Sequence, residues 1–124
     1  MYVTIVLYED FFVRTYGRLK RINDFNRLYR SGRSFKARGA VLLVKGNRSS
    51  RTRVGFSVSK KIGNAVKRNR CKRRLREAVY KYNDRLLAGF DLVFVARSYD
   101  REEPFDELCR DVGMLLNKAN VLKK

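Results

Sequence analysis

The sequence predicts an α+β protein, a sandwich with the element order α-β-β-α-β-α in which helices pack on one small sheet. Three observations lead to this prediction. Some segments have alternating or continuous apolar residues, as strands do, and others have apolar residues every three to four positions, as helices do. The length of 124 residues fits one domain with one modest core. No apolar stretch is long enough to cross a membrane as a helix.

Residues 1–17 differ from the rest of the chain, and we treat residues 18–124 as the single folded domain. The stretch YVTIVLY (2–8) suits an added edge strand. The alternative hypothesis is that the native protein begins near Val13, where the sequence VRTYGRLKR becomes basic, so that residues 1–12 are absent from it. The start lacks the basic leading region and cleavage site of a signal peptide, so we expect a cytoplasmic protein.

The segment RINDFNRLYRSGRS predicts the first helix, about two turns long. Asn23 or Asp24 would cap it by accepting from free backbone N–H groups. Gly32 would end it in a left-handed conformation. The helical spacing places three apolar side chains on one face. These side chains are Phe25, Leu28 and Tyr29.

Two strands are predicted next, over residues 40–45 and 53–59. In the second, apolar residues alternate with small or polar ones, which gives the strand one apolar face. A short polar loop joins the two, so the simplest pairing is an antiparallel hairpin. The alternating apolar residues are Val54, Phe56 and Val58.

Two further helices flank a strand in the second half of the chain. A helix is predicted from Ala65 to about Leu87, ended by Gly89. The apolar run FDLVFVA (90–96) predicts a largely buried strand, and a final amphipathic helix begins at Phe105. The apolar residues of the first of these helices are Cys71, Leu75, Ala78, Val79, Tyr82 and Leu86. Those of the second are Leu108, Cys109, Val112, Leu115, Leu116 and Ala119.

The charge of the chain is concentrated in one part of it. Between Phe25 and Arg76 there are 18 Lys and Arg and no acid, whereas the remaining 12 basic and 12 acidic residues cancel. The net charge of +18 therefore comes from one continuous window. A polyanion is the natural partner of such a window, and nucleic acid is the commonest.

On a helical wheel, the helix that begins at Ala65 has an apolar face and a face of hydrogen-bond donors. Asn69, Lys72 and Arg76 fall within about 40° of Ala65, at about 100° per residue. Like charges in such a row repel each other, which an RNA or DNA backbone would relieve. The start of the helix offers backbone N–H groups to an anion. Around it lie Lys60, Lys61, Gly63 and Asn64.

The cysteines argue against a structural metal. Cys71 and Cys109 are not in a CxxC pair, and the chain has no histidine. A structural zinc site needs about four such ligands. We interpret both residues as buried, reduced thiols rather than a disulfide.

The stretch RVGFSVSKKIGNAVKRNRCKRRLRE (53–77) resembles the signature of the protein subunit of bacterial ribonuclease P. Weaker agreement extends from Arg18 to about Ala119. The resemblance implies a ribosomal protein S5 domain 2-like fold with a left-handed βαβ crossover. It also implies a non-catalytic RNA-binding subunit in a ribonucleoprotein whose RNA, using Mg²⁺, hydrolyses a phosphodiester to remove the 5′ leader of precursor tRNA.

The resemblance further implies two RNA-binding sites, no catalytic or metal-ligating protein residue, no membrane contact and one protein per RNA. The first site binds the RNA subunit through Lys60, Lys61, Asn64, Arg68, Asn69, Arg70, Lys72, Arg73 and Arg76. The second, a cleft between the first helix and the sheet, holds the leader. Its matching positions are Phe25 and Tyr29, with Phe56 and Ser57 on the bordering strand.

Alternatives remain open at the level of the residues. Phe25, Tyr29 and Phe56 have the spacing of core residues as well, and the strand AVLLVK lacks the aromatic that relatives often carry. A ribosomal RNA-binding protein would have the same composition. A nuclease with a protein active site would need a base or a carboxylate cluster, and the basic window has neither histidine nor acid. A DNA groove reader would need more than arginines, which favour the backbone.

Overall fold

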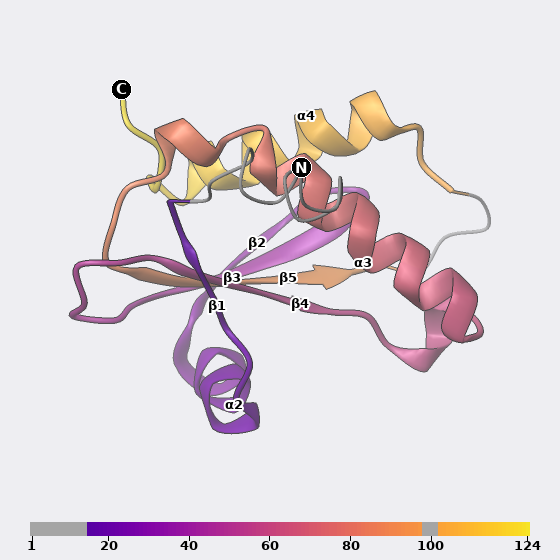
Figure 1. Ribbon diagram of the computed structural model, residues 1–124, viewed down its shortest axis with the longest axis horizontal. Helices are drawn as coiled ribbons and strands as arrows, with labels where there is room; N and C mark the ends of the chain where they lie inside the picture. The colour runs from indigo at the N-terminus through magenta and orange to yellow at the C-terminus, as the bar shows by residue number, and fades with distance from the viewer. Residues whose placement is uncertain (1–14, 98–101) are drawn as a thin grey trace, which may run out of the picture.

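The computed structural model describes residues 15–97 and 102–124. A mixed five-stranded sheet carries α2 on one face and α3 with α4 on the other (Figure 1). In chain order the elements are β1 (Gly17–Arg18), α2 (Ile22–Ser31), β2 (Arg33–Lys36), β3 (Ala40–Gly46), β4 (Arg53–Ser57), the 3₁₀ helix η1 (Lys60–Ile62), α3 (Ala65–Tyr80), the 3₁₀ helix η2 (Asn83–Arg85), β5 (Phe90–Ala96) and α4 (Phe105–Lys118). The predicted α+β class is confirmed.

Strand β5 lies at the centre of the sheet, whose order is β1-β4-β5-β3-β2. It runs parallel to β4 and antiparallel to β3. Residues 91–94 of β5 are buried, as a continuous apolar run favours. The predicted hairpin of β3 with β4 is therefore wrong. The chain leaves β4, forms α3, and returns to insert the most apolar strand between the two.

This return makes β4, α3 and β5 a βαβ crossover between adjacent parallel strands. The crossover agrees with the fold that the resemblance implies, while its left-handed sense stays a prediction. The crossover places the basic stretch after β4 along one face of the sheet. The apolar side of α3 faces the sheet, and its basic side is left for a partner. The buried residues of α3 are Leu75, Ala78 and Val79.

Two apolar clusters hold the layers together. The larger one fills the space between the sheet and the pair α3 and α4. The smaller one lies under α2, where it consists of Leu19, Leu28, Leu43 and Val93, with Phe25, Val41 and Val95 packed against it. Few buried side chains thus hold α2 on the sheet, so its polar contacts contribute a larger share of the energy that keeps it there.

Several boundaries differ from the predicted ones. Gly32 has φ −75° and is extended, and Arg21 is the N-cap without a side-chain hydrogen bond, so neither predicted cap of α2 forms. The reason at Gly32 is that β2, which the sequence did not predict, begins at the next residue. Helix α3 ends at Tyr80, earlier than expected, because Tyr82 turns to donate its hydroxyl to the Cys109 carbonyl at 2.8 Å.

The N-terminal boundary of the domain also differs from the predicted one. Tyr16 is 2% exposed and belongs to the larger core, and Gly17 pairs with Arg53. Residues 15–17 are therefore part of the fold, and a boundary before Arg18 falls inside β1. The strand predicted over residues 2–8 and the start predicted near Val13 lie outside the described residues.

Candidate nucleic-acid interface

Helix α3 begins with its first turn open to solvent, as predicted. The Asn64 side chain caps it by accepting from the Lys67 N–H at 3.0 Å. Gly63, between η1 and α3, has φ +146°, a conformation that L side chains rarely adopt. Lys60, Lys61 and Asn64 are all exposed. The positive end of the helix and two lysines therefore face the solvent together.

The face of donors continues along the exposed side of α3 as a row of five side chains, called the donor row below: Arg68, Asn69, Lys72, Arg73 and Arg76. Asn69 and Arg73 are exposed, whereas Arg68 and Lys72 are half-buried. Arg68 donates to the Gly63 carbonyl at 2.9 Å, so its guanidinium also stabilises the turn before the helix. Asn69 and Arg73 are thus the members of the row with the freest access to a partner.

A hollow of about 180 Å³ lies between the donor row and strands β1 and β4. Arg76 covers one wall, with its guanidinium carbon 5.8 Å from the centre of the Phe56 ring. Arg18 also lines this hollow, and it is a cation outside the predicted site residues. Its only sequence signal is the basic segment that precedes α2. The remaining lining residues are Tyr16, Leu19, Val54, Gly55 and Lys72.

Arg70 does not share this surface. Its guanidinium donates to Glu102 through two nitrogens, at 2.8 and 3.0 Å. It lines a different hollow, on the side of α3 that faces the start of α4. The structure therefore brings eight of the nine predicted residues to the η1–α3 start and the donor row, and it separates Arg70 from them.

Tyr29 and Ser57 meet where the leader surface was predicted. The Tyr29 side chain is exposed, and its hydroxyl donates to Ser57 Oγ at 2.9 Å. Phe25 is half-buried against Gly55, where an added Cβ would come within 2.6 Å of the Phe25 ring. Of the aromatic pair, Phe25 therefore packs mainly on the core, and Tyr29 presents its ring to solvent.

Phe56 lies on the opposite face of the sheet from Tyr29. It stacks on Phe94 at 6.0 Å between ring centres and packs against the core under α3. The structure therefore does not bring Phe56 together with Phe25, Tyr29 and Ser57. The alternation along β4 explains this, because Val54 and Phe56 point to one face and Ser57 to the other.

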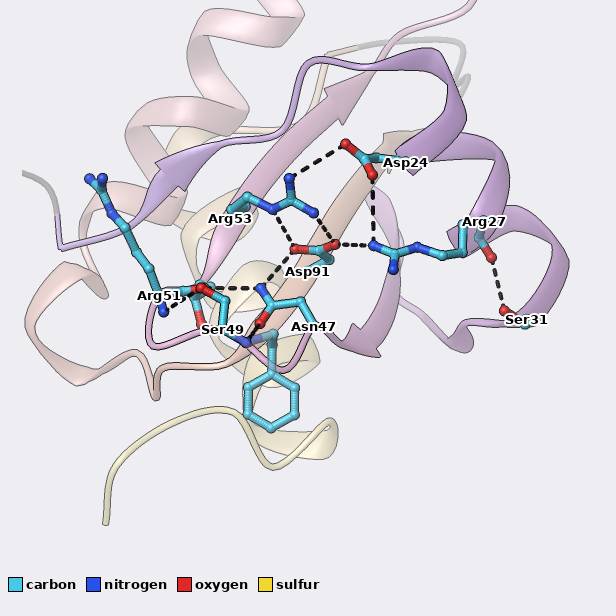
Figure 2. A network of polar contacts seen from close by, with 10 residues as sticks. Asp24, Arg27, Ser31, Asn47, Ser49, Arg51, Arg53 and Asp91 are labelled. Carbon is cyan, nitrogen blue, oxygen red and sulfur yellow. Dashed lines mark hydrogen bonds and ion pairs between the residues drawn. The ribbon is translucent and has the colours of Figure 1, made fainter.

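A buried carboxylate ties α2 to the sheet (Figure 2). The Asp91 side chain has no exposed surface and accepts from Arg53 at 2.7 and 2.9 Å, from Arg27 at 2.5 Å and from Asn47 at 2.9 Å. Asp24 lies 3.5 Å from Arg53. Burial acts to raise the pKa of Asp91, but the donors from Arg53 and Asn47 and the charge of Arg27 offset it, so the pKa lies below its usual value.

Two arginines of the basic window stabilise the fold through this network. Arg27 comes from α2, Arg53 from β4 and Asp91 from β5. The sequence does not indicate this network, because Asp91 lies outside the acid-free window and no local pattern points to its partners. The position of Tyr29 relative to Ser57 depends on these contacts, since they hold α2 against the sheet.

Cys71 and Cys109 are both free thiols, as expected, and both are half-buried. Burial raises the pKa of each thiol, so both are thiols rather than thiolates at neutral pH.

Within residues 15–97 and 102–124, no helix is long and apolar enough to cross a membrane. Those same ranges contain no group of three or more acidic, histidine or cysteine side chains placed to hold a metal ion.

Comparison with known proteins supplies the family. The family model described as Ribonuclease P matches residues 13–120. The ribonuclease P protein component of Clostridioides difficile is 37% identical over 112 residues, covering 89% of this chain and 96% of that protein. That of Chloroflexus aurantiacus is 42% identical over 106 residues, covering 85% and 78%.

Solved structures agree with the sequence comparison. The RNase P protein of Staphylococcus aureus superposes with a TM-score of 0.77 at 34% identity, covering 86% of this chain and 97% of that one. The RNase P protein of Thermotoga maritima gives a TM-score of 0.72 at 28% identity, covering 82% and 96%. The fold, the basic surface of α3 and these matches lead to one conclusion: the chain belongs to the ribonuclease P protein family.

Proposed function

We propose that this chain is the protein subunit of ribonuclease P and assists removal of the 5′ leader from precursor tRNA. The observation that carries the proposal is the surface of α3 in a chain of this family. An open helix start, two exposed lysines and the donor row form a continuous basic surface opposite the apolar face of the helix. Such a surface fits the backbone of a structured RNA.

The RNA subunit would contact the η1–α3 start and the donor row. Asn69 and Arg73 are exposed and Asn64 lies at the helix start, so phosphates can reach both backbone and side-chain donors. The hollow lined by Arg18, Lys72 and Arg76 adjoins this surface and adds cations to it.

The leader would bind on the other face, across α2 and β4. The exposed ring of Tyr29 offers a stacking surface, and stacking of a base on an aromatic ring is tolerant of sequence. Ser57 adds a hydroxyl beside it. Phe25 packs on the core beside Gly55, and Phe56 is not part of this surface because it lies on the opposite face of the sheet.

Catalysis in this proposal belongs to the RNA subunit, and the protein supplies no catalytic residue. The Mg²⁺ ions of the reaction would be held by the RNA. The described residues do not fit a dedicated magnesium site, since they contain no group of three or more acidic, histidine or cysteine side chains placed to hold a metal ion.

The holoenzyme in this proposal is cytoplasmic and contains one protein for each RNA. The stoichiometry of one protein for each RNA is what the resemblance to the family implies. A ribosomal RNA-binding role would require the same charge, and identification of the RNA that copurifies with the protein separates the two roles.

Reconstitution tests the function directly. The chain is added to a bacterial ribonuclease P RNA at low Mg²⁺ together with precursor tRNA, and leader removal is followed. We expect cleavage with both components and none with the protein alone. Specific cleavage by the protein without the RNA, or no gain from adding it, would overturn the proposal.

A further inference from the structure

A second row of cations runs along α3 on the side away from the donor row. At about 100° per residue, Lys67, Arg70 and Arg74 lie roughly 140–200° from Ala65, and the donor row lies close to Ala65 itself. The three side chains line a hollow of about 380 Å³ together with Arg97. The helix therefore presents cations on both sides of its buried seam.

Glu102 occupies this hollow as an anionic ligand would. Its two carboxylate oxygens each accept one hydrogen bond from Arg70, and it lies 3.6 Å from Arg74. Hydrogen bonds from Arg70 lower the pKa of Glu102, so the carboxylate is ionised. The parallel fork that Arg70 forms is equally suited to two oxygens of a phosphate.

The other groups around the hollow leave it positive. Arg74 is fixed by donating to the Glu103 backbone carbonyl. The Glu103 carboxyl lies beside Asp111, and burial together with that neighbour raises its pKa to about 7, which reduces its negative charge. No acid of the described residues forms an ion pair with Lys67.

The contact with Glu102 is also easy to exchange. The side chains of Arg70 and Glu102 are 53% and 48% exposed. An exposed ion pair of this kind shifts an equilibrium by at most a few-fold. A backbone phosphate carries one negative charge, as the carboxylate does, and offers Arg70 two oxygens in the same way, so it can displace the carboxylate at little cost.

We propose that this hollow binds a backbone phosphate of the RNA subunit, with Glu102 holding the place of that phosphate in the free protein. The proposal rests on the function proposed above and extends the RNA surface to Lys67 and Arg74. Arg70 then contacts RNA as predicted, but from the second row and only after Glu102 has been displaced.

The first test is the affinity of the full chain for the RNA subunit in two variants. Glu102→Gln removes the competing charge and keeps the shape, so the Kd should fall about 3- to 5-fold. Asp106→Asn is the matched control, because its side chain is 75% exposed and pairs with Arg110 on α4. Its effect should stay under about 2-fold, since salt screens distant charges.

The second test removes a cation. Lys67→Ala should raise the Kd several-fold and reduce the slope of log K against log salt by about 1. In an Arg70→Ala background, Glu102→Gln should gain less than it does alone, because the competition acts chiefly through Arg70. An unchanged or raised Kd for Glu102→Gln, or an unchanged Kd for Lys67→Ala, would overturn the proposal.

Two further measurements distinguish an RNA site from a small-anion site and the second row from the donor row. The first measures the binding of inorganic pyrophosphate. If Lys67→Ala weakens pyrophosphate binding while the affinity for the RNA stays unchanged, the hollow binds a free oligophosphate and the proposed RNA site is overturned.

The second uses Arg73→Ala, on the donor row, and tests the underlying function independently. If it weakens RNA binding while Glu102→Gln and Lys67→Ala do nothing, the second row fails and the proposed function stands.

Discussion

The Asp91 network and helix α3 are both rich in arginine, yet their arginines have different surroundings. In the network, Arg27 and Arg53 donate to a carboxylate without exposed surface. On α3, the side chain of Arg73 is 60% exposed and lies 3.8 Å from Glu77. Removing one partner of a buried charge pair is costly, whereas an exposed ion pair contributes little. Arginines of the same basic window therefore hold the fold together in one region and face solvent in the other.

The comparison shows that a net charge of +18 is not a count of RNA contacts. Arg27 and Arg53 share the buried carboxylate of Asp91, which lies far away in sequence, and both also lie near Asp24. Arg70 is paired as well, but with an exposed partner that RNA can replace. The physical distinction among these three is the burial of the carboxylate.

The largest expected effect comes from breaking the buried network. Asp91→Asn should lower the free energy of unfolding by about 3 kcal/mol, because two guanidinium groups lose their charged acceptor. Urea denaturation measures this value, with Asp106→Asn as the control of equal charge change. A loss for Asp91→Asn as small as that of the control would mean that the network does not hold α2 in place.

The next effect concerns the leader surface that the network positions. Tyr29→Ala should raise KM for a precursor with a leader by about 10-fold, since one stacked base contributes roughly 1–3 kcal/mol. KM for an RNA without a leader should change little. Equal effects on both substrates would remove Tyr29 from the leader surface. Phe25→Ala is a poorer test, because it also opens the core.

Two carboxyl groups, those of Asp91 and Glu103, should change the stability of the protein with pH in opposite directions. The pKa of Asp91 is lowered, so its contribution to stability is present above the unfolded value of 3.8 and is lost as pH falls through the folded pKa.

The pKa of Glu103 is raised from 4.5 to about 7 by burial and by Asp111 and Glu107, against the charge of Arg38. The folded state then holds its proton longer, so stability falls as pH rises from about 4.5 to 7.

A substitution at the second carboxyl isolates that slope. Glu103→Gln should remove this slope. Relative to the unsubstituted protein, the variant should gain roughly 1 kcal/mol more in free energy of unfolding at pH 8 than at pH 5, a value reduced for the partial solvation of the side chain. Urea denaturation of both proteins at the two pH values gives the difference. The same pH dependence in the variant would assign the slope to another group.

Local patterns predicted much of the fold. The ranges of β3, β5 and α4 follow from apolar spacing within each segment, and Asn64 caps α3 where its side chain was expected to lie. The strand order did not follow, because insertion of β5 between β3 and β4 depends on packing of distant segments. Strand β2 is four residues long at a sheet edge, too short for a distinct pattern.

The site was predicted less completely than the fold. The donor row follows from a helical wheel, which is a property of α3 alone. The Arg70–Glu102 and Arg53–Asp91 pairs join residues 32 and 38 positions apart, and no local signal indicates them. Phe56 is different, because its alternation with Val54 already favoured the core face and could have excluded it from the leader surface.

Paired substitution of Arg53 and Arg73 tests the division between structural and RNA-facing arginines most directly. For Arg53→Gln and Arg73→Gln, the salt dependence of RNA-subunit binding and the free energy of unfolding are measured together. We expect Arg73→Gln to reduce the slope of log K against log salt by about 1 with stability unchanged. Arg53→Gln should lower stability and leave the slope as it is. Equal changes in slope for the two variants would contradict this division.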